Sequence, residues 1–280
     1  MLDKILYADS GTGNTREMLK MLLDLPAFRR SAVNILRVIP TQASADELAS
    51  KFEEEGDALS EVISNVNLDP AKVSTMIKQG DPKETVCKSA DEIDADLILM
   101  GSRGLKRLES FFANSVSQYV FQLTNRPMLL VKDDIYVKRI KRVMVALDKS
   151  DSASYALELA LYLLRDYTEA ELYLVRINPD MKPNMELSQE DMNNNSILAP
   201  ALKQAERMGI KTKCVVSGGR PAQQMCQLVD DLDIDLFLLG SPDRRPSIAK
   251  NLVDLDRLLG TSLSDYVRVN SNCPVLLVRK

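Results

Sequence analysis

Residues 95–102 read ADLILMGS, and residues 234–241 read IDLFLLGS. Each segment is a short apolar run that ends in glycine and serine, which is typical of a strand buried on both faces of a sheet. The same spacing of 139 positions relates Gly80 to Gly219. The chain is therefore a tandem repeat, and one structural unit explains both of its halves.

The last segments of the two halves also match each other. SVSQYVFQLTNRPMLLVK occupies residues 115–132, and SLSDYVRVNSNCPVLLVR occupies residues 262–279. The spacing between these segments is eight residues longer, so the second half carries an insertion just before its last segment. We place the two domains at residues 1–134 and 139–280, on either side of a charged joint.

Each half alternates strand-like apolar runs with longer helical patterns. In the first half the strand-like runs are ILYA, AVNILRVI, KVSTMIKQ, LILMG and PMLLVK. Crossovers long enough to hold a helix favour parallel pairing of the strands that they connect. We therefore predict an α/β protein with two doubly wound, five-stranded parallel-sheet domains of the Rossmann-like type. Such a domain binds ligands at the carboxyl ends of its strands.

The composition narrows the class of protein. Apolar residues make up 45% of the chain and charged residues 27%, as in ordinary globular proteins. A net charge of −4 does not attract nucleic acid, and no apolar run reaches the roughly 18–20 residues of a membrane span. The chain has no histidine, which excludes Ser-His-Asp triads and histidine-ligated metal sites. Four cysteines without CxxC spacing, and no signal-peptide pattern, indicate reduced thiols in a cytoplasmic protein.

Two glycine-containing segments are candidates for binding a phosphate. DSGTGNTRE, residues 9–17, follows the first apolar run and leads into a helix. MGSRGLKRLESFFANSVSQYV, residues 100–120, follows the fourth apolar run and ends in hydroxyl residues at a helix start. Glycines let a phosphate approach the backbone, N–H groups at a helix N-terminus bind it, and Arg103 adds a bidentate donor. Both segments fall at the carboxyl edge of the predicted sheet.

The second of these segments resembles the nucleotide loop of the universal stress protein family. In that loop a glycine, two residues, a second glycine, nine residues and a third glycine precede Ser or Thr. The strand-end aspartates of ILYAD and VMVALD are also similar to that family, as are the final segments of both halves. The resemblance implies an adenine nucleotide alpha hydrolase-like fold that binds ATP, ADP or AMP, with or without Mg²⁺. It further implies a stress-response sensor or regulator that is not an enzyme, and a homodimer formed through the terminal strands. The end strands PMLLVK and PVLLVR are also apolar enough to pair with each other within one chain, which would join the halves before two such chains associate.

The resemblance also assigns roles to single residues. It places Asp9 near the adenine and the ribose, the Val38 backbone at the adenine, and the Ser115 hydroxyl at the phosphates. Asn114 stands where the family has glycine, which favours AMP or ADP over a triphosphate. In the second half PDRRPS replaces the second glycine, so we expect a remodelled or lost site there. The predicted nucleotide site has no catalytic residue and no metal ligand, and consists of Asp9, Ser10, Gly11, Val38, Met100, Gly101, Arg103, Gly104, Asn114, Ser115, Val116 and Ser117.

Other interpretations of these residues stay open. Residues 10–15, SGTGNT, match the flavodoxin phosphate loop, which would bind FMN for electron transfer, although the chain has no Trp to flank a flavin. The same loop and Asp9 are also compatible with a turn and helix cap that bind no ligand. The protein would then be a stress scaffold that acts through protein partners. Arg37 and Arg176 recur in the two halves and are interpreted as surface residues of a strand face.

Overall fold

The computed structural model describes residues 2–11, 13–41, 45–66, 70–102, 115–181, 195–241 and 262–279. Strands and helices alternate through both halves, as the apolar runs predict. The first half contains β1 (Lys4–Ala8), α1 (Gly13–Leu23), β2 (Ala32–Ile39), α2 (Ala45–Val66), β3 (Val73–Gln79), α3 (Pro82–Glu92), β4 (Leu97–Ser102), α4 (Val116–Leu123) and β5 (Met128–Lys132). The second half contains β6 (Arg142–Ala146), α5 (Asp151–Leu164), β7 (Glu171–Asn178), α7 (Leu198–Arg207), β8 (Lys211–Gly218), α8 (Pro221–Asp231), β9 (Leu236–Gly240), α10 (Leu263–Asn270) and β10 (Val275–Val278).

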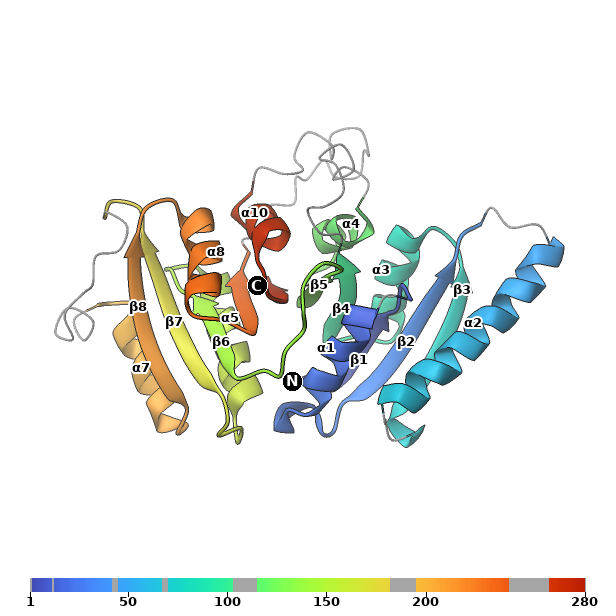
Figure 1. Cartoon of the computed structure of the whole chain (residues 1–280), viewed down its shortest axis with the longest axis horizontal. Coiled ribbons are helices and arrows are strands. Elements are labelled where there is room, and N and C mark those ends of the chain that lie inside the picture. The colour runs from blue at the N-terminus through green and yellow to red at the C-terminus, as the bar shows by residue number, and fades with distance from the viewer. Residues whose placement is uncertain are drawn as a thin grey trace.

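The strands form one sheet in the order β3-β2-β1-β4-β5-β10-β9-β6-β7-β8 (Figure 1). Within each half all neighbouring strands are parallel, and β1 and β6 each lie between two neighbours. This is the doubly wound arrangement predicted from the sequence. In both halves the strand order reverses beside the first strand, so the loop after that strand lies at the switch point where such folds bind ligands.

The two halves are joined by their last strands. β10 pairs with β5 in antiparallel orientation, with Leu276 opposite Leu129, so the two five-stranded sheets are continuous. β5 also pairs with β4, and β10 also pairs with β9. Both terminal strands therefore have a neighbour on each side within one chain. A second chain could pair with these strands only after an exchange of strands, because neither has a free edge, and the homodimer stays a prediction.

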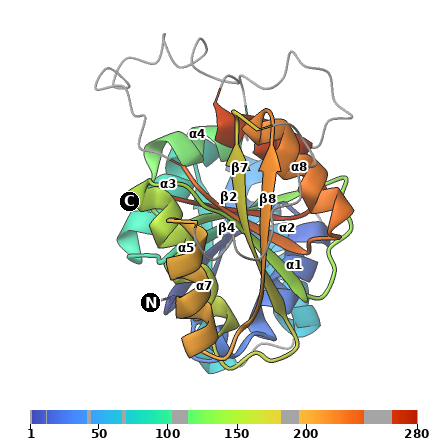
Figure 2. The same cartoon turned by 90° about the vertical axis from the view of Figure 1, so that its left-hand side faces the viewer.

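Helices cover both faces of the sheet. The buried side chains of α1, α2, α5 and α7 pack into one apolar cluster, and those of α3, α4, α8 and α10 pack into another. In Figure 2, α7 and α8 accordingly lie on opposite sides of β8. Strands covered on both sides favour apolar residues at successive positions, and β5 accordingly begins with the four apolar residues MLLV, followed by a buried lysine, Lys132. No helix in the described ranges is long and apolar enough to cross a membrane.

The seam between the halves contains buried polar side chains as well as leucines. The Gln118 amide of α4 donates to Asp265 of α10 over 3.4 Å. The Arg279 guanidinium lies 3.9 Å from the centre of the Phe121 ring. The Lys132 ammonium donates to the Val269 carbonyl at 3.1 Å. These contacts hold α4 and α10 side by side on one face of the sheet, near the β5–β10 joint (Figure 1).

Candidate functional site

The ends of three strands meet beside Asp9. Ala8, the last residue of β1, is in register with Leu36 of β2 and with Met100 of β4. The Asp9 N–H donates to the Leu36 carbonyl at 3.0 Å, so the chain leaves the sheet at that point. The fold thus brings Asp9, Val38 and the Met100–Gly101 strand end to one edge, as the sequence predicts. Arg103, Gly104 and Asn114 lie outside the described residues.

The Asp9 carboxylate is buried and fully hydrogen-bonded. Its Oδ1 atom accepts from the Tyr7 hydroxyl at 2.8 Å and from the Gly11 N–H at 3.0 Å. Its Oδ2 atom accepts from Arg37 Nε at 3.0 Å and from Arg37 Nη2 at 2.7 Å. Burial, followed by the negative charge of Asp9, raises the pKa of the Tyr7 phenol, so this hydroxyl remains a donor. Gly11 has a φ of +80°, which lets the chain turn back toward Asp9.

Arg37 is part of this network and is not a surface residue. Its side chain is only 11% exposed, because it lies against Asp9 and also pairs with Glu55 of α2. Burial acts to lower the pKa of the guanidinium, but Asp9 and Glu55 raise it above its ordinary value. The interpretation of Arg37 as a surface arginine was wrong. Its recurrence at Arg176 was the signal in the sequence, but the sequence does not indicate which carboxylate it meets.

Two side chains of the SGTGNT loop, Asn14 and Thr15, bond to other parts of the protein. The Thr15 hydroxyl is fully buried and lies 3.1 Å from the Tyr7 hydroxyl. The Asn14 amide donates to the carbonyls of Lys132 and Ile135, both at 3.0 Å, and so ties the start of α1 to the interdomain linker. The Thr15 hydroxyl and the Asn14 amide thus make hydrogen bonds that hold the fold together. This supports the turn-and-cap interpretation of this part of the loop. Ser10 and Gly11 remain exposed beside it.

Among the residues that the structure describes, no side chain caps the N-terminus of α4. Ser115 occupies the N-cap position, yet its hydroxyl makes no capping bond and lies 3.0 Å from the Ser117 hydroxyl. The first turn contains no acidic residue. The first N–H groups of any helix have no partner within the helix, and they carry partial positive charge. The nearby Ser102 hydroxyl, at the end of β4, is buried and has no hydrogen-bond partner in the described structure.

The equivalent end of α10 is closed by its own side chains. The Ser262 hydroxyl accepts from the Asp265 N–H at 3.1 Å and donates to the Asp265 carboxylate at 2.7 Å. Asp265 is buried, and it places a negative charge in the first turn of the helix. The Asp265 carboxylate is paired with Arg268 at 3.8 Å, so the side-chain cap by Ser262 is the feature that makes this helix end less suited to a phosphate. The expectation of a remodelled second site therefore has a structural basis in α10, although residues 242–261 lie outside the described ranges.

The strand-end residues of the second half also differ from those of the first. Asp148 is exposed and accepts from the backbone N–H of Ser150 at 2.8 Å. Among the described residues, no ion pair joins it to Arg176. Gly240 is needed for packing: a Cβ atom there would lie 2.4 Å from the Ala153 nitrogen and 2.7 Å from the Ser152 carbonyl oxygen. The absence of a side chain at Gly240 thus allows β9 and α5 to pack closely.

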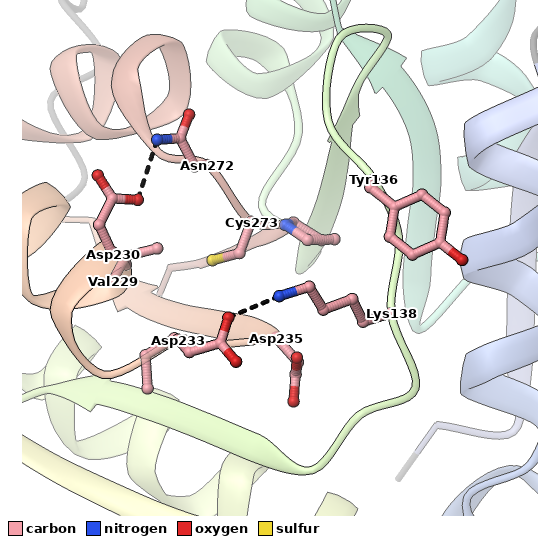
Figure 3. Close-up of a pocket in the computed structure, with 10 residues that line it drawn as sticks. Tyr136, Lys138, Val229, Asp230, Asp233, Asp235, Asn272 and Cys273 are labelled. Atoms are coloured by element: carbon pink, nitrogen blue, oxygen red, sulfur yellow. Dashed lines mark hydrogen bonds and ion pairs between the residues drawn. The ribbon is translucent and has the colours of Figure 1, made fainter.

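A pocket of about 210 Å³ lies elsewhere, between the interdomain linker and the second half (Figure 3). Lys138 reaches from the linker to Asp233 at 2.6 Å, and Asn272 donates to Asp230 at 2.9 Å. Asp235 accepts from two backbone N–H groups at the start of β6. Each of these carboxylates therefore holds the linker or a turn in place. In the described parts of the chain, no group of three His, Cys, Asp or Glu side chains is arranged to hold a metal ion.

Comparison with known proteins places both halves in one family. The model of the universal stress protein family matches residues 1–132 and again residues 139–279. A universal stress protein of Methanocaldococcus jannaschii, MJ0577, is 30% identical over 118 residues, which cover 42% of this chain and 67% of that protein. One from Synechocystis, Sll1654, is 26% identical over 135 residues, which cover 47% of this chain and 86% of that protein.

A solved structure covers both halves at once. The universal stress protein from Archaeoglobus fulgidus DSM 4304 superposes with a TM-score of 0.74 at 21% identity, covering 100% of this chain and 99% of that one. This likeness shows a shared fold over the full ten-stranded sheet. Since the family model matches nearly the whole chain in two copies, the protein belongs to the universal stress protein family and is a tandem member of it.

Proposed function

We propose that this protein binds an adenine nucleotide, AMP, ADP or ATP, at the carboxyl edge of its first half. The observation that carries the proposal is the contrast between the two related helix ends. Within the described ranges, the N-terminus of α4 has no side-chain cap and its first turn has no acidic residue, whereas the N-terminus of α10 is capped by Ser262 and carries Asp265. An uncapped helix N-terminus next to hydroxyl groups is suited to a phosphate.

The proposed site uses different parts of this edge for different parts of the ligand. Ser115, Val116 and Ser117 would hold the phosphates, and Gly101 at the end of β4 would let them approach the backbone. Val38, half-buried near the end of β2, would offer its backbone to the adenine. Asp9, Ser10 and Gly11 would lie at the sugar. Met100, Arg103, Gly104 and Asn114 complete the proposed set, and any Mg²⁺ would arrive with the nucleotide.

The proposed role is that of a sensor or regulator in the stress response and not that of an enzyme. The chain has no histidine to serve as a general base. The carboxylate at the site, Asp9, is already occupied by an ion pair with Arg37. The four cysteines are free thiols, which suits the reducing cytoplasm in which we place the protein.

Calorimetric titration with AMP, ADP and ATP, each with and without Mg²⁺, tests this function. We expect one nucleotide per chain. Replacing Ser115→Ala should weaken binding by roughly tenfold, the effect of losing one hydrogen bond to a charged phosphate. The matched variant Ser262→Ala should bind as the wild type does, yet lose about 1 kcal/mol of stability because that hydroxyl caps α10.

Two results would contradict the proposal. Equal binding by the wild type and Ser115→Ala would place the nucleotide elsewhere. No binding at all would favour the non-binding scaffold, which one observation already supports: every hydrogen-bonding position of Asp9 is filled within the chain. Purified protein that is yellow would instead indicate FMN, so the absorbance spectrum serves as the control for that alternative.

A further inference from the structure

The hydrogen bonds of Asp9 leave no room for a sugar hydroxyl. A carboxylate has about four lone-pair positions, and four donors reach the two oxygens of Asp9. Two of these donors, the Tyr7 hydroxyl and the Gly11 N–H, come from the strand and loop next to Asp9. The other two belong to Arg37. A ligand that bonds to Asp9 must therefore displace the Arg37 guanidinium.

The position of Arg37 is suited to such a displacement. A Cβ atom added to Gly11 would lie 3.7 Å from Nη2 and 3.8 Å from Nη1 of Arg37, so the guanidinium packs directly against the exposed loop. Its other side meets Glu55, whose side chain is 31% exposed. The Arg37 guanidinium thus lies between the buried carboxylate of Asp9 and the half-exposed carboxylate of Glu55, and Glu55 is on the side toward solvent.

The second half shows that the fold does not require this ion pair. Asp148 and Arg176 occupy the equivalent positions, yet Asp148 bonds to Ser150 and remains exposed. β6 and β7 still pair over five residues, as β1 and β2 do. The ion pair in the first half is therefore a local feature of the edge where the nucleotide is proposed to bind.

We propose that Arg37 is an affinity-determining residue that acts as a latch on Asp9. In the closed state its guanidinium occupies the carboxylate and lowers the affinity for a nucleoside phosphate. In the open state the guanidinium leaves Asp9 while staying beside Glu55, and Asp9 accepts the ribose hydroxyls. This inference rests on the proposed nucleotide site and concerns the regulation of that site.

Nucleotide titration of Arg37 variants tests the latch. Arg37→Gln removes the charge and the two-pronged contact, so the nucleotide no longer has to break them, and we expect roughly tenfold tighter binding of AMP. Arg37→Lys keeps the positive charge but loses the two-donor contact with Asp9, and should raise the affinity for AMP by an intermediate factor of about three. Arg176→Gln makes the same change in the second half and should leave the affinity unaltered. In the wild type, the NMR signal of the Arg37 Nε–H group should shift on addition of AMP.

The outcomes separate the latch from the nucleotide site. If the wild type binds AMP and both Arg37 variants bind it equally or more weakly, Arg37 is structural or contacts the ligand, and the latch is overturned while the site stands. If no variant binds AMP, including Arg37→Gln with its released Asp9, both proposals fail. Should Arg37→Gln not fold, the conservative Arg37→Lys variant decides the question alone.

Discussion

At the scale of single residues, the two halves diverge most at their strand-end aspartates. Asp9 is buried and paired with Arg37, whereas Asp148 is exposed and bonded to the next turn. Transfer of a carboxylate from water into the protein interior costs several kcal/mol, unless opposite charge and hydrogen bonds offset that cost. Arg37 supplies both to Asp9, so this arginine should matter to the stability of the first half in a way that Arg176 does not matter to the second.

Replacing Arg37→Ala should lower the free energy of unfolding by roughly 3–5 kcal/mol, because a buried carboxylate loses its partner. Replacing Arg176→Ala, in the related position, should change it by less than about 1 kcal/mol, because this half-buried arginine has no ion pair with Asp148 among the described residues. Urea denaturation of both variants measures the difference. Equal losses would mean that the ion pair contributes no more than the packing of an arginine stem.

Cys273 makes the stability of the protein sensitive to alkaline pH. Burial is the main cause that raises the pKa of its thiol to about 12. In the unfolded chain a thiol ionises near pH 8.5, so above that pH the unfolded state loses a proton that the folded state keeps. The advantage of the wild type over Cys273→Ala should be constant below about pH 8.5. It should then fall by roughly 1.4 kcal/mol per pH unit as the pH rises toward the folded-state pKa.

Urea unfolding of the wild type and Cys273→Ala at pH 7, 9.5 and 10.5 checks this pH dependence. The comparison cancels the titration of lysines and tyrosines, which are the same in both proteins. A constant difference across the three pH values would show that the Cys273 thiol ionises as readily in the folded protein as in the unfolded one.

At the scale of elements, two helices built from matching segments end differently. α4 and α10 align residue by residue, but the third residue of the helix is Gln118 in one and Asp265 in the other. In α10 the Asp265 carboxylate also accepts from the Ser262 hydroxyl, in addition to the backbone capping bond, and α4 has no carboxylate at that position. The Gln118 amide of α4 donates to the Asp265 carboxylate of α10 across the seam. The uncapped helix start therefore contacts the capped one directly.

The glycines of two other elements should respond oppositely to an added methyl group. Gly240→Ala should destabilise the protein by about 1–3 kcal/mol, since β9 would have to move away from the start of α5. Gly56→Ala, in the interior of α2, meets nothing within 4 Å and should stabilise the protein by roughly 0.5–1 kcal/mol. Thermal unfolding of the two variants provides the test. A stabilised Gly240→Ala variant would contradict the close contact between β9 and α5.

At the scale of the whole molecule, the β5–β10 joint makes the two halves one sheet. The outer edges of this sheet are β3 and β8, which carry Lys78, Lys211 and Lys213. Lysines on an edge strand discourage pairing with another chain. The apolar strands lie at the centre and the charged strands lie at the margins, an order that opposes growth of the sheet beyond one chain.

Cross-linking distinguishes pairing within one chain from exchange of strands between two. Cysteines introduced in pairs at Leu129 and Leu276, or at Met128 and Leu277, occupy opposed positions of β5 and β10. On oxidation, at least one pair should form an internal disulfide and migrate at the 31.3 kDa of a single chain under non-reducing conditions. A covalent dimer in place of that band would show that the last strands pair between chains. The native cysteines interfere little, because burial raises the pKa of the Cys87 and Cys226 thiols to about 11 and suppresses their reactivity.

The sequence by itself determined the repeat, the strand–helix alternation and the edge at which the candidate residues gather. These depend on local periodicity and on the rule that parallel strands end at one side of a sheet. Only the tertiary structure decided which chain the last strands pair with, that Arg37 occupies Asp9, and that α10 caps itself while α4 does not. Each of these depends on the distance and direction between side chains or strands that the folded backbone brings together. Residue pattern alone specifies neither distance nor direction.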